Sequence, residues 1–311
     1  MGSLHIDYRP QSFEEVIGNK GVISSLKSIL SREKENIPHA MLFSGQSGCG
    51  KTTLARIVAE KLGCPEKIND EPNGDFIEIN ASNNRGIDTA RSIMQTMHYH
   101  PAISECRVWL LDEVHQATKD FQNSLLKALE DSPEHTYFLL CTTEPEKLLK
   151  TILNRCSTFE VENVNDKGLY QLLNWVSTEE DVGIPDDVKD EIVEVSDGCP
   201  RQALVTLDQV IDLPEEEMLG AVKNAKVEEK DVRELCQAML KGSSWKKASS
   251  ILKKLKGTDP EKFRRAILGY MSAVLLNGGD PQAALIIDLF KEPSFYSGMP
   301  GIVLATYQSL E

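Results

Sequence analysis

The sequence has 311 residues, of which 41% are hydrophobic and 26% are charged, with 34 Lys and Arg against 48 Asp and Glu. This is the composition of a globular chain, and it excludes collagen, a coiled-coil rod and a disordered tail. At roughly 100–200 residues per domain, the length predicts two or three domains. No apolar run approaches the roughly 20 residues of a membrane span, and residues 1–10 lack an apolar signal core, so we expect a soluble, intracellular protein.

The net charge of −14 is concentrated in one segment. Residues 160–219 hold 17 acidic and three basic side chains, so the rest of the chain is balanced. Residues 226–311 hold 13 basic and ten acidic side chains, among them Lys246, Lys247 and Lys253. A local positive surface for a polyanion therefore stays open, although a solvated Lys-rich helix face is the simpler explanation of this cluster.

The seven cysteines stand singly along the chain. No two have the two-residue gap with which paired thiolates hold zinc, and several lie in apolar runs such as 139–141. We therefore expect buried free thiols in a reducing compartment, with neither a zinc site nor a disulfide framework.

Short apolar runs alternate with helical patterns from about residue 38 to 160, which predicts a parallel sheet covered by helices. Strands are expected at 40–43, 76–79, 108–111, 137–141 and 157–159. From about 165 to 225 leucines and valines recur at helical spacing, and beyond 226 further helices follow, one of them opened by Asp280-Pro281. The expected domains are a sheet domain at 1–162, a small acidic helical subdomain at 163–225 and a separate helical domain at 226–311.

A glycine-rich run lies between the first expected strand and a helical pattern that begins at Thr53. It reads Gly45-Gln46-Ser47-Gly48-Cys49-Gly50-Lys51-Thr52. This strand–loop–helix context is that of a phosphate-binding loop, and it argues against a glycine-rich turn with an accidental Gly-Lys-Thr. Backbone amides would face the anion, Lys51 would reach the β- and γ-phosphates, and the Thr52 hydroxyl would bind Mg²⁺.

Two carboxylates, Asp112 and Glu113, follow the apolar run 108–111. At the carboxyl end of a strand both would lie near the phosphates, where Asp112 would hold magnesium and Glu113 would polarise the attacking water. Acidic residues also end strands for solubility, but the phosphate loop favours the catalytic interpretation.

Three further polar sites are ambiguous on their own. Thr142 and Thr143 follow an expected strand and could hold the water or the γ-phosphate, or the pair could only terminate that strand. Arg155 would be an ordinary surface arginine on most folds, and Arg201 could simply pair with Asp197.

In their order along the chain, these motifs resemble the clamp-loader ATPases of the AAA+ class, namely the bacterial DNA polymerase III gamma/tau subunit and the replication factor C small subunits. The resemblance covers roughly residues 7–210. It rests on Tyr8-Arg9-Pro10, the phosphate loop, and the stretches 78–88, 111–115, 142–145, 154–156 and 198–203.

The resemblance implies a fold, an α/β AAA+ P-loop sheet with a helical lid and an all-α collar, and it implies site roles. Tyr8, Arg9 and Pro10 would line the adenine pocket with Val16 and Ile17, next to the phosphate loop from Gly45 to Thr53. Thr143 would be the first sensor and Arg201 the second. Arg155 would be the finger that completes the ATP site of a neighbouring subunit, and Arg85 a basic residue near DNA that is coupled to Glu113.

The implied function is that of an ATPase subunit in a hetero-oligomeric ring or spiral, by analogy a pentamer. With ATP and Mg²⁺ it would open a sliding clamp and load it on primer–template DNA in DNA replication, and DNA and clamp would stimulate its hydrolysis. Two alternatives stay open: another AAA+ DNA motor, such as a branch-migration helicase, and a scaffold subunit that binds nucleotide without hydrolysing it.

The sequence departs from the family pattern in three places. The triplet around Arg155 begins with Asn154 instead of Ser, and only Cys64 lies where the bacterial subunit has a zinc module. We also expect the chain to lack the long gamma/tau tail. This combination predicts a bacteriophage clamp-loader large subunit, acting in the cytoplasm of a bacterium or of an infected host.

Overall fold

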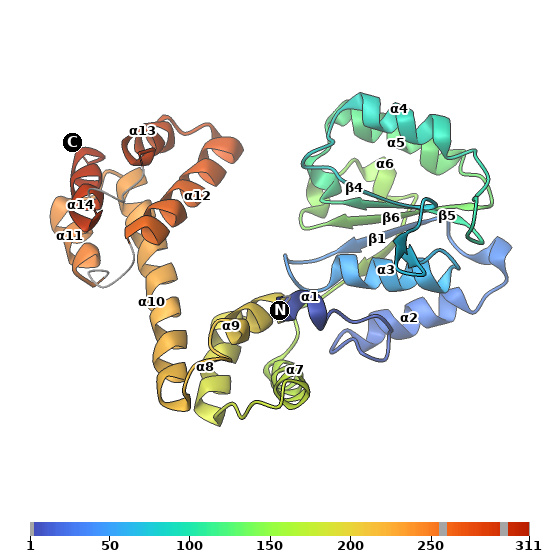
Figure 1. The fold of residues 1–311 in the computed structure, drawn as a ribbon. Coiled ribbons are helices and arrows are strands. Elements are labelled where there is room, and N and C mark those ends of the chain that lie inside the picture. The colour runs from blue at the N-terminus through green and yellow to red at the C-terminus, as the bar shows by residue number, and fades with distance from the viewer. Residues whose placement is uncertain (1–2, 255–259, 293–297, 311) are drawn as a thin grey trace. The chain divides into compact units, whose positions relative to one another are not determined.

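The computed structural model describes residues 3–254, 260–292 and 298–310 and divides into two compact units, Met1–Glu215 and Glu216–Glu311. The first unit is built on a five-stranded parallel sheet (Figure 1). Its order is β4 (Phe76–Asn80), β5 (Arg107–Asp112), β6 (Thr136–Thr142), β1 (Ala40–Ser44) and β7 (Ser157–Glu160). All five strands lie where apolar runs predict them, which confirms the α/β fold class. The predicted domain boundaries at residues 162 and 225 stay predictions.

Each central strand is buried on both faces, which is why its sequence reads as a continuous apolar run. Met41 and Phe43 of β1 pack on one face, while Ala40 and Leu42 pack on the other. The first face is covered by α2 (Lys20–Leu30) and α3 (Lys51–Lys61). The second is covered by α4 (Ile87–Thr96), α5 (Lys119–Glu130) and α6 (Lys150–Leu153) (Figure 1).

The first unit also contains several short elements. They are α1 (Leu4–Asp7), the 3₁₀ turns Lys34–Asn36, Val114–Gln116 (η2) and Pro145–Lys147, and the antiparallel pair β2 (Lys67–Ile68) and β3 (Glu71–Pro72).

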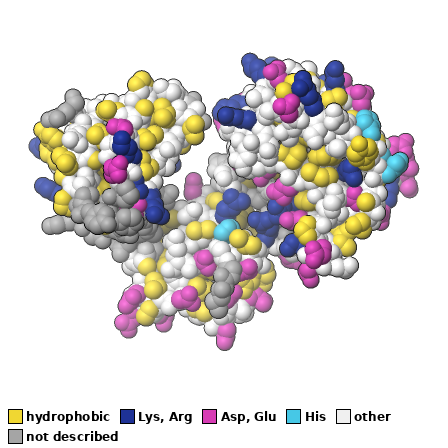
Figure 2. Space-filling model, turned by 45° about the horizontal axis from the view of Figure 1, so that its top comes forward, with side chains coloured by type: hydrophobic (Ala, Val, Ile, Leu, Met, Phe, Trp, Pro, Cys, Tyr) yellow, Lys and Arg dark blue, Asp and Glu magenta, His cyan; other side chains and the backbone are white. Residues whose placement is uncertain are grey.

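Three helices after the sheet form the lid segment: α7 (Asp166–Glu179), α8 (Asp186–Ser196) and α9 (Pro200–Asp208). The Asn165 side chain caps α7 by accepting a hydrogen bond from the Gly168 amide at 2.9 Å. Figure 2 shows acidic side chains over this segment, which lies within the range 160–219 that holds 17 acidic and three basic residues.

The second unit is helical in its described residues. It contains α10 (Glu215–Leu240), which begins one residue before the unit, α11 (Trp245–Lys254), α12 (Pro260–Gly278), α13 (Pro281–Phe290) and α14 (Gly298–Gln308). Asp280 caps α13 as the sequence predicts, accepting from the Gln282 amide at 2.9 Å. Phe263, Ile267 and Met271 of α12 are fully buried in its core. Among the described residues of both units, no helix is long and apolar enough to cross a membrane.

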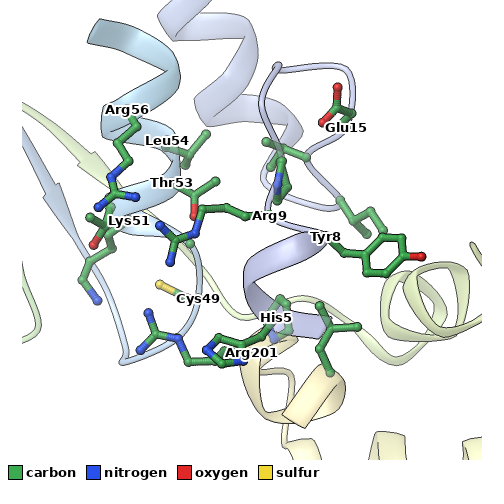
Figure 3. Close-up of a pocket in the computed structure, with 18 of the residues that line it drawn as sticks. His5, Tyr8, Arg9, Glu15, Cys49, Lys51, Thr53, Leu54, Arg56 and Arg201 are labelled. Carbon is green, nitrogen blue, oxygen red and sulfur yellow. The ribbon is translucent and has the colours of Figure 1, made fainter. Parts of the chain in front are cut away.

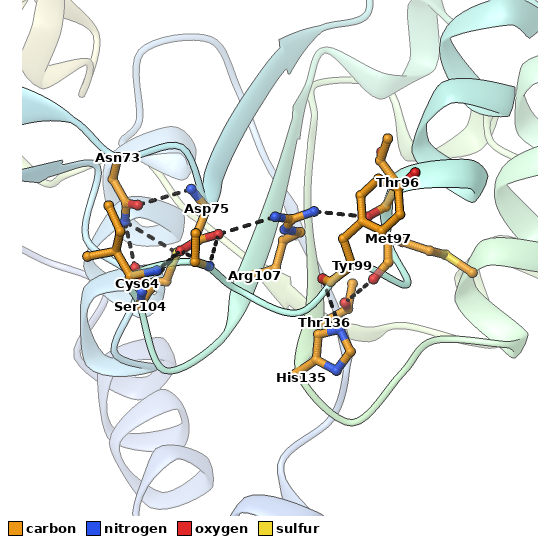
Figure 4. A network of polar contacts seen from close by, with 12 residues as sticks. Cys64, Asn73, Asp75, Thr96, Met97, Tyr99, Ser104, Arg107, His135 and Thr136 are labelled. Carbon is orange, nitrogen blue, oxygen red and sulfur yellow. Dashed lines mark hydrogen bonds and ion pairs between the residues drawn. The ribbon is translucent and has the colours of Figure 1, made fainter.

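A buried carboxylate, Asp75, ties the loop before β5 to the sheet (Figure 4). Its side chain is 1% exposed and accepts hydrogen bonds from the backbone amides of Ala102, Ile103 and Ser104 at 2.8–3.0 Å. Arg107 pairs with it at 3.3 Å and donates to the Thr96 carbonyl at 2.9 Å. Burial alone would raise the pKa of Asp75, but these amide donors and Arg107 outweigh burial and lower the pKa below its ordinary value.

We expect Asp75→Asn to lower the free energy of unfolding by about 2–4 kcal/mol. The new NH₂ group would face backbone N–H groups that need an acceptor, and Arg107 would lose its carboxylate partner. Since the folded pKa is depressed, this stabilisation is complete above the ordinary pKa of about 4 and is lost as pH falls through the folded value. Urea denaturation at pH 7 and pH 3 measures both effects.

Asp88→Asn is the matched control, because the Asp88 side chain is 92% exposed and makes a surface pair with Arg91 at 3.2 Å. It should change stability by less than about 0.5 kcal/mol. Equal losses for the two variants would contradict the anchoring role of Asp75.

Candidate functional site

The first unit has a cavity of about 270 Å³ at the carboxyl edge of the sheet, between the phosphate loop, the N-terminal segment and helices α7 and α9 (Figure 3). The sequence-predicted residues that line it are Tyr8, Arg9, Pro10, Val16, Ile17, Ser47, Gly48, Cys49, Gly50, Lys51, Thr52, Thr53, Asp112, Glu113 and Arg201. The fold therefore brings together residues from positions 8 to 201 of the chain.

Two glycines of the loop occupy backbone positions at which a side chain would be strained or would clash. Gly48 has φ +78°, and a Cβ there would lie 2.4 Å from the Cys199 sulfur. Gly45 has φ +148°, and a Cβ there would lie 2.1 Å from the Val161 carbonyl oxygen. The loop backbone therefore lies directly against Val161 at Gly45 and against the start of α9 at Gly48, where a side chain would not fit.

Lys51 opens α3 and is 5% exposed. Its ammonium donates hydrogen bonds to the carbonyls of Gly45 and Gln46 at 3.0 and 2.7 Å. These two predicted loop residues do not line the cavity. A buried ammonium held by neutral carbonyls favours an anion at the loop.

Three arginines add to this positive charge. Arg9, Arg56 and Arg201 come from the N-terminal segment, α3 and α9 and lie around the same cavity (Figure 3). Burial and the neighbouring charges of Arg56 and Arg201 lower the pKa of Arg9. Arg56 pairs with Glu78 at 2.7 Å and with Glu66 at 3.3 Å. Arg9, Arg201 and Lys51 therefore supply most of the positive charge that suits a polyphosphate.

Oxygen ligands lie beside the loop at the end of β5. The Thr52 hydroxyl donates to Asp112 Oδ2 at 3.1 Å, which joins α3 to the strand. A hydroxyl and a carboxylate are ligands of the kind that Mg²⁺ prefers, so these two residues fit the metal role that the sequence predicts.

Glu113 takes a left-handed backbone conformation, with φ 50° and ψ 41°. Few residues other than glycine adopt it, and such positions gather at functional sites. Thr143, at the end of the neighbouring strand β6, donates to Glu113 Oε2 at 3.4 Å. Thr143 is therefore joined to the site through Glu113.

The lid closes the apolar end of the cavity. Tyr8 donates a hydrogen bond to Glu180 at 2.7 Å, which together with burial raises the pKa of Tyr8 to about 12. Its ring meets Trp175 of α7 edge-on, with centroids 5.3 Å apart. Cys199 caps α9, with its sulfur near the Ser47 carbonyl at 3.6 Å, and so sets Arg201 over the loop.

Several lining residues were not predicted from the sequence: His5, Glu15, Leu54, Arg56, Glu78, Leu172, Trp175, Pro200 and Leu204. One turn of helix separates Arg56 from Thr52, so this spacing could have indicated Arg56. Nothing in the sequence links Trp175 or Leu172 to residues more than 150 positions away.

Two predicted residues lie elsewhere. Arg155 follows α6, where it forms an ion pair with Glu130 and donates to the Thr151 carbonyl at 3.0 Å. Arg85 is exposed before α4, and its carbonyl accepts from the Thr118 amide at 3.1 Å. Neither lines the cavity of its own chain.

The known proteins that this chain resembles in sequence include several subunits of DNA polymerase III. The family model described as DNA polymerase III, delta subunit, matches residues 18–165. DNA polymerase III subunit tau of Bacillus subtilis is 35% identical over 223 residues, which is 67% of this chain. The tau subunit of Escherichia coli is 35% identical over 218 residues, or 66% of this chain. The gamma subunit of Buchnera aphidicola is 33% identical over 220 residues.

This chain spans 39% of the length of the Bacillus protein, 34% of the Escherichia protein and 60% of the Buchnera protein. Among solved structures, the RuvB Holliday junction branch migration motor of Thermotoga maritima matches with a TM-score of 0.58 and 22% identity. That match covers 73% of this chain and 78% of RuvB and supports the fold.

We expect Gly48→Ala to weaken binding of a nucleoside triphosphate at least about tenfold. The left-handed backbone costs alanine about 1–2 kcal/mol, and the new methyl group would push the Cys199 sulfur and α9 away. Equilibrium titration with a fluorescent nucleoside triphosphate measures the effect.

The double variant Gly48→Ala/Cys199→Ala, compared with Cys199→Ala alone, is the matched control, because both lack the sulfur that caps α9 and that the new methyl group would meet. In this background Gly48→Ala should cost less affinity than it does beside Cys199. An equal loss in the two backgrounds would show that the contact with α9 is not the cause.

Proposed function

This chain belongs to the AAA+ ATPases of the clamp-loader class, and from that premise we propose that it binds and hydrolyses ATP as one subunit of an assembly that loads a sliding clamp on primer–template DNA. The observation that carries the proposal is the convergence of Lys51, Thr52, Asp112, Glu113 and Arg201 on one cavity. We place this activity in the cytoplasm; the phage origin stays a prediction.

The chemistry assigned to the cavity is hydrolysis at the γ-phosphate. Lys51 would exchange its loop carbonyls for phosphate oxygens, and Arg201 would bring the lid onto the same phosphates. Mg²⁺ held by Thr52 and Asp112 would offset negative charge on the β- and γ-phosphates. Glu113 would accept a proton from the attacking water, while Tyr8, Arg9, Pro10, Val16 and Ile17 hold the base and sugar end.

The position of Arg155 is the reason to propose an ATP site that two subunits share. Its guanidinium lies on the surface, 36% exposed, and pairs with Glu130 of its own chain. We propose that it reaches the ATP of the next subunit, where it would stabilise charge that develops on the γ-phosphate. A site completed by a neighbour requires a ring or spiral, for which we propose a pentamer with a second kind of subunit.

DNA and clamp are the proposed stimulating partners. Arg85 lies on the exposed segment between β4 and α4, and its carbonyl is bonded to the residue that caps α5. We propose that a DNA phosphate bound by Arg85 would shift this hydrogen bond and, through Thr118 and η2, the backbone that carries Glu113. The resemblance in fold to RuvB favours, as second candidate, a motor that moves on duplex DNA.

The test of the function is the steady-state ATPase rate of the protein with its partner subunit, measured with primer–template DNA, with a clamp and with both. We expect a sharp rise only with both. Glu113→Gln should keep ATP binding and lower the rate at least about 100-fold, because it cannot accept the proton. Full stimulation by duplex DNA alone would favour the motor, and ATP binding without hydrolysis in any mixture would favour a scaffold.

The role of Arg155 is tested by mixing two inactive variants. Lys51→Ala should lose ATP binding, and Arg155→Ala should lose the charge offered to its neighbour. In a mixed oligomer an intact site forms where a Lys51→Ala subunit offers its Arg155 to an Arg155→Ala subunit, so activity should return. No recovery in an oligomer shown to be mixed would contradict the finger.

A further inference from the structure

His115 lies directly behind the proposed catalytic carboxylate. It belongs to the short turn η2, its side chain is 4% exposed, and it does not line the cavity. Its ring lies between two carboxylates: Nδ1 is 3.4 Å from Glu113 Oε2, and Nε2 is 3.2 Å from Glu144 Oε1. One imidazole thus connects the end of β5 with the segment that follows β6.

The Nδ1 edge of the ring is fixed by a second oxygen. Nδ1 lies 3.1 Å from the Thr142 hydroxyl oxygen, which also accepts a hydrogen bond from the Glu144 amide at 3.1 Å. Thr142 is fully buried in β6, so this hydroxyl has little freedom to move. The strand end therefore sets the position from which Nδ1 meets Glu113.

The far edge of the ring is also held. Nε2 lies 2.8 Å from the Gln116 side-chain nitrogen, which can donate to it when Nδ1 carries the proton. It also lies 3.2 Å from Glu144 Oε1, and Glu144 pairs with Lys147 at 2.7 Å. These contacts orient the ring but do not involve Glu113. The two edges of His115 therefore have separable tasks.

Both side-chain contacts of Glu113 fall on the same oxygen. His115 Nδ1 and the Thr143 hydroxyl each approach Oε2 at 3.4 Å. In the part of the chain that the structure describes, Oε1 has no hydrogen-bond or ion-pair partner, while Glu113 lines the cavity. One oxygen is anchored, and the other is left for the water that would be activated.

We infer that His115 is a positioning residue whose Nδ1 edge holds Glu113 Oε2, so that Oε1 faces the attacking water. This rests on the proposed ATPase function and deepens it. Holding a general base in one orientation before reaction contributes to rate without contributing to substrate affinity. A histidine that only filled space here would affect stability and leave the turnover of folded protein unchanged.

The two edges of the ring can be separated by substitution. The amide nitrogen of asparagine at 115 occupies the place of Nδ1, whereas that of glutamine reaches toward the place of Nε2. We expect His115→Asn to keep kcat within about threefold of wild type and His115→Gln to lower it at least about tenfold. The dissociation constant for ATP and the KM should stay within about twofold in both, since Lys51 and Arg201 are untouched.

Glu144→Gln is a matched control, because it changes only the Nε2 side; kcat should stay within about threefold. If His115→Gln does not fold, as judged by thermal unfolding, His115→Ala compared with Glu144→Gln replaces it, and the alanine variant should show the tenfold loss. Equal kcat values for the asparagine and glutamine variants, or a loss confined to ATP affinity, would overturn the positioning role.

Wild type and Glu113→Gln are measured in the same assays to separate the two proposals. If wild type hydrolyses ATP, Glu113→Gln does not, and His115→Gln behaves as wild type, only the role of His115 is overturned. If wild type fails to hydrolyse ATP with its partners, or Glu113→Gln hydrolyses it normally, the proposed function falls and the inference on His115 falls with it.

Discussion

Parallel pairing of β1, β6 and β5 is the constraint on which the site depends, because parallel strands carry all their carboxyl ends to one edge of the sheet. In this register Ser44 lies opposite Thr142, and Leu111 lies opposite Leu140. The phosphate loop, the Asp112–Glu113 pair and the Thr142–Thr143 pair therefore emerge side by side. Apolar burial on both faces holds this register, since a slip of one residue would turn each strand's side chains to the wrong layer.

Charge at this edge is organised by the same constraint. Lys51, Arg9, Arg56 and Arg201 surround the cavity from three separate segments, and the carboxylates of Asp112 and Glu113 lie at its sheet end. Burial and the neighbouring cations lower the pKa of Arg9. Arg56 is paired with Glu78 and Glu66, and a polyphosphate would offset the positive charge that remains. A net charge of −14 therefore coexists with a local anion site, because most acidic excess lies in the lid segment.

The lid completes the cavity through few contacts. Tyr8 joins the N-terminal segment to α7 through Glu180 and Trp175, and Cys199 joins α9 to the loop at Ser47. These links combine residues that the chain separates by more than 150 positions. Arg201 thus lies near the loop only while α9 stays against Gly48, which couples the lid position to phosphate recognition.

The five strands, the phosphate loop and the roles of Lys51, Thr52, Asp112 and Glu113 could be predicted from the amino-acid sequence, because their signals are local: apolar runs, glycine spacing and strand ends. The three-dimensional fold was needed to show that Arg56, Glu78 and Trp175 share the cavity and that His115 lies between Glu113 and Glu144. Most of these contacts join segments distant in sequence, and even the Glu113–His115 contact depends on the conformation of the turn after β5. A local sequence pattern does not specify which side chains the fold brings within hydrogen-bond distance at the edge of the sheet.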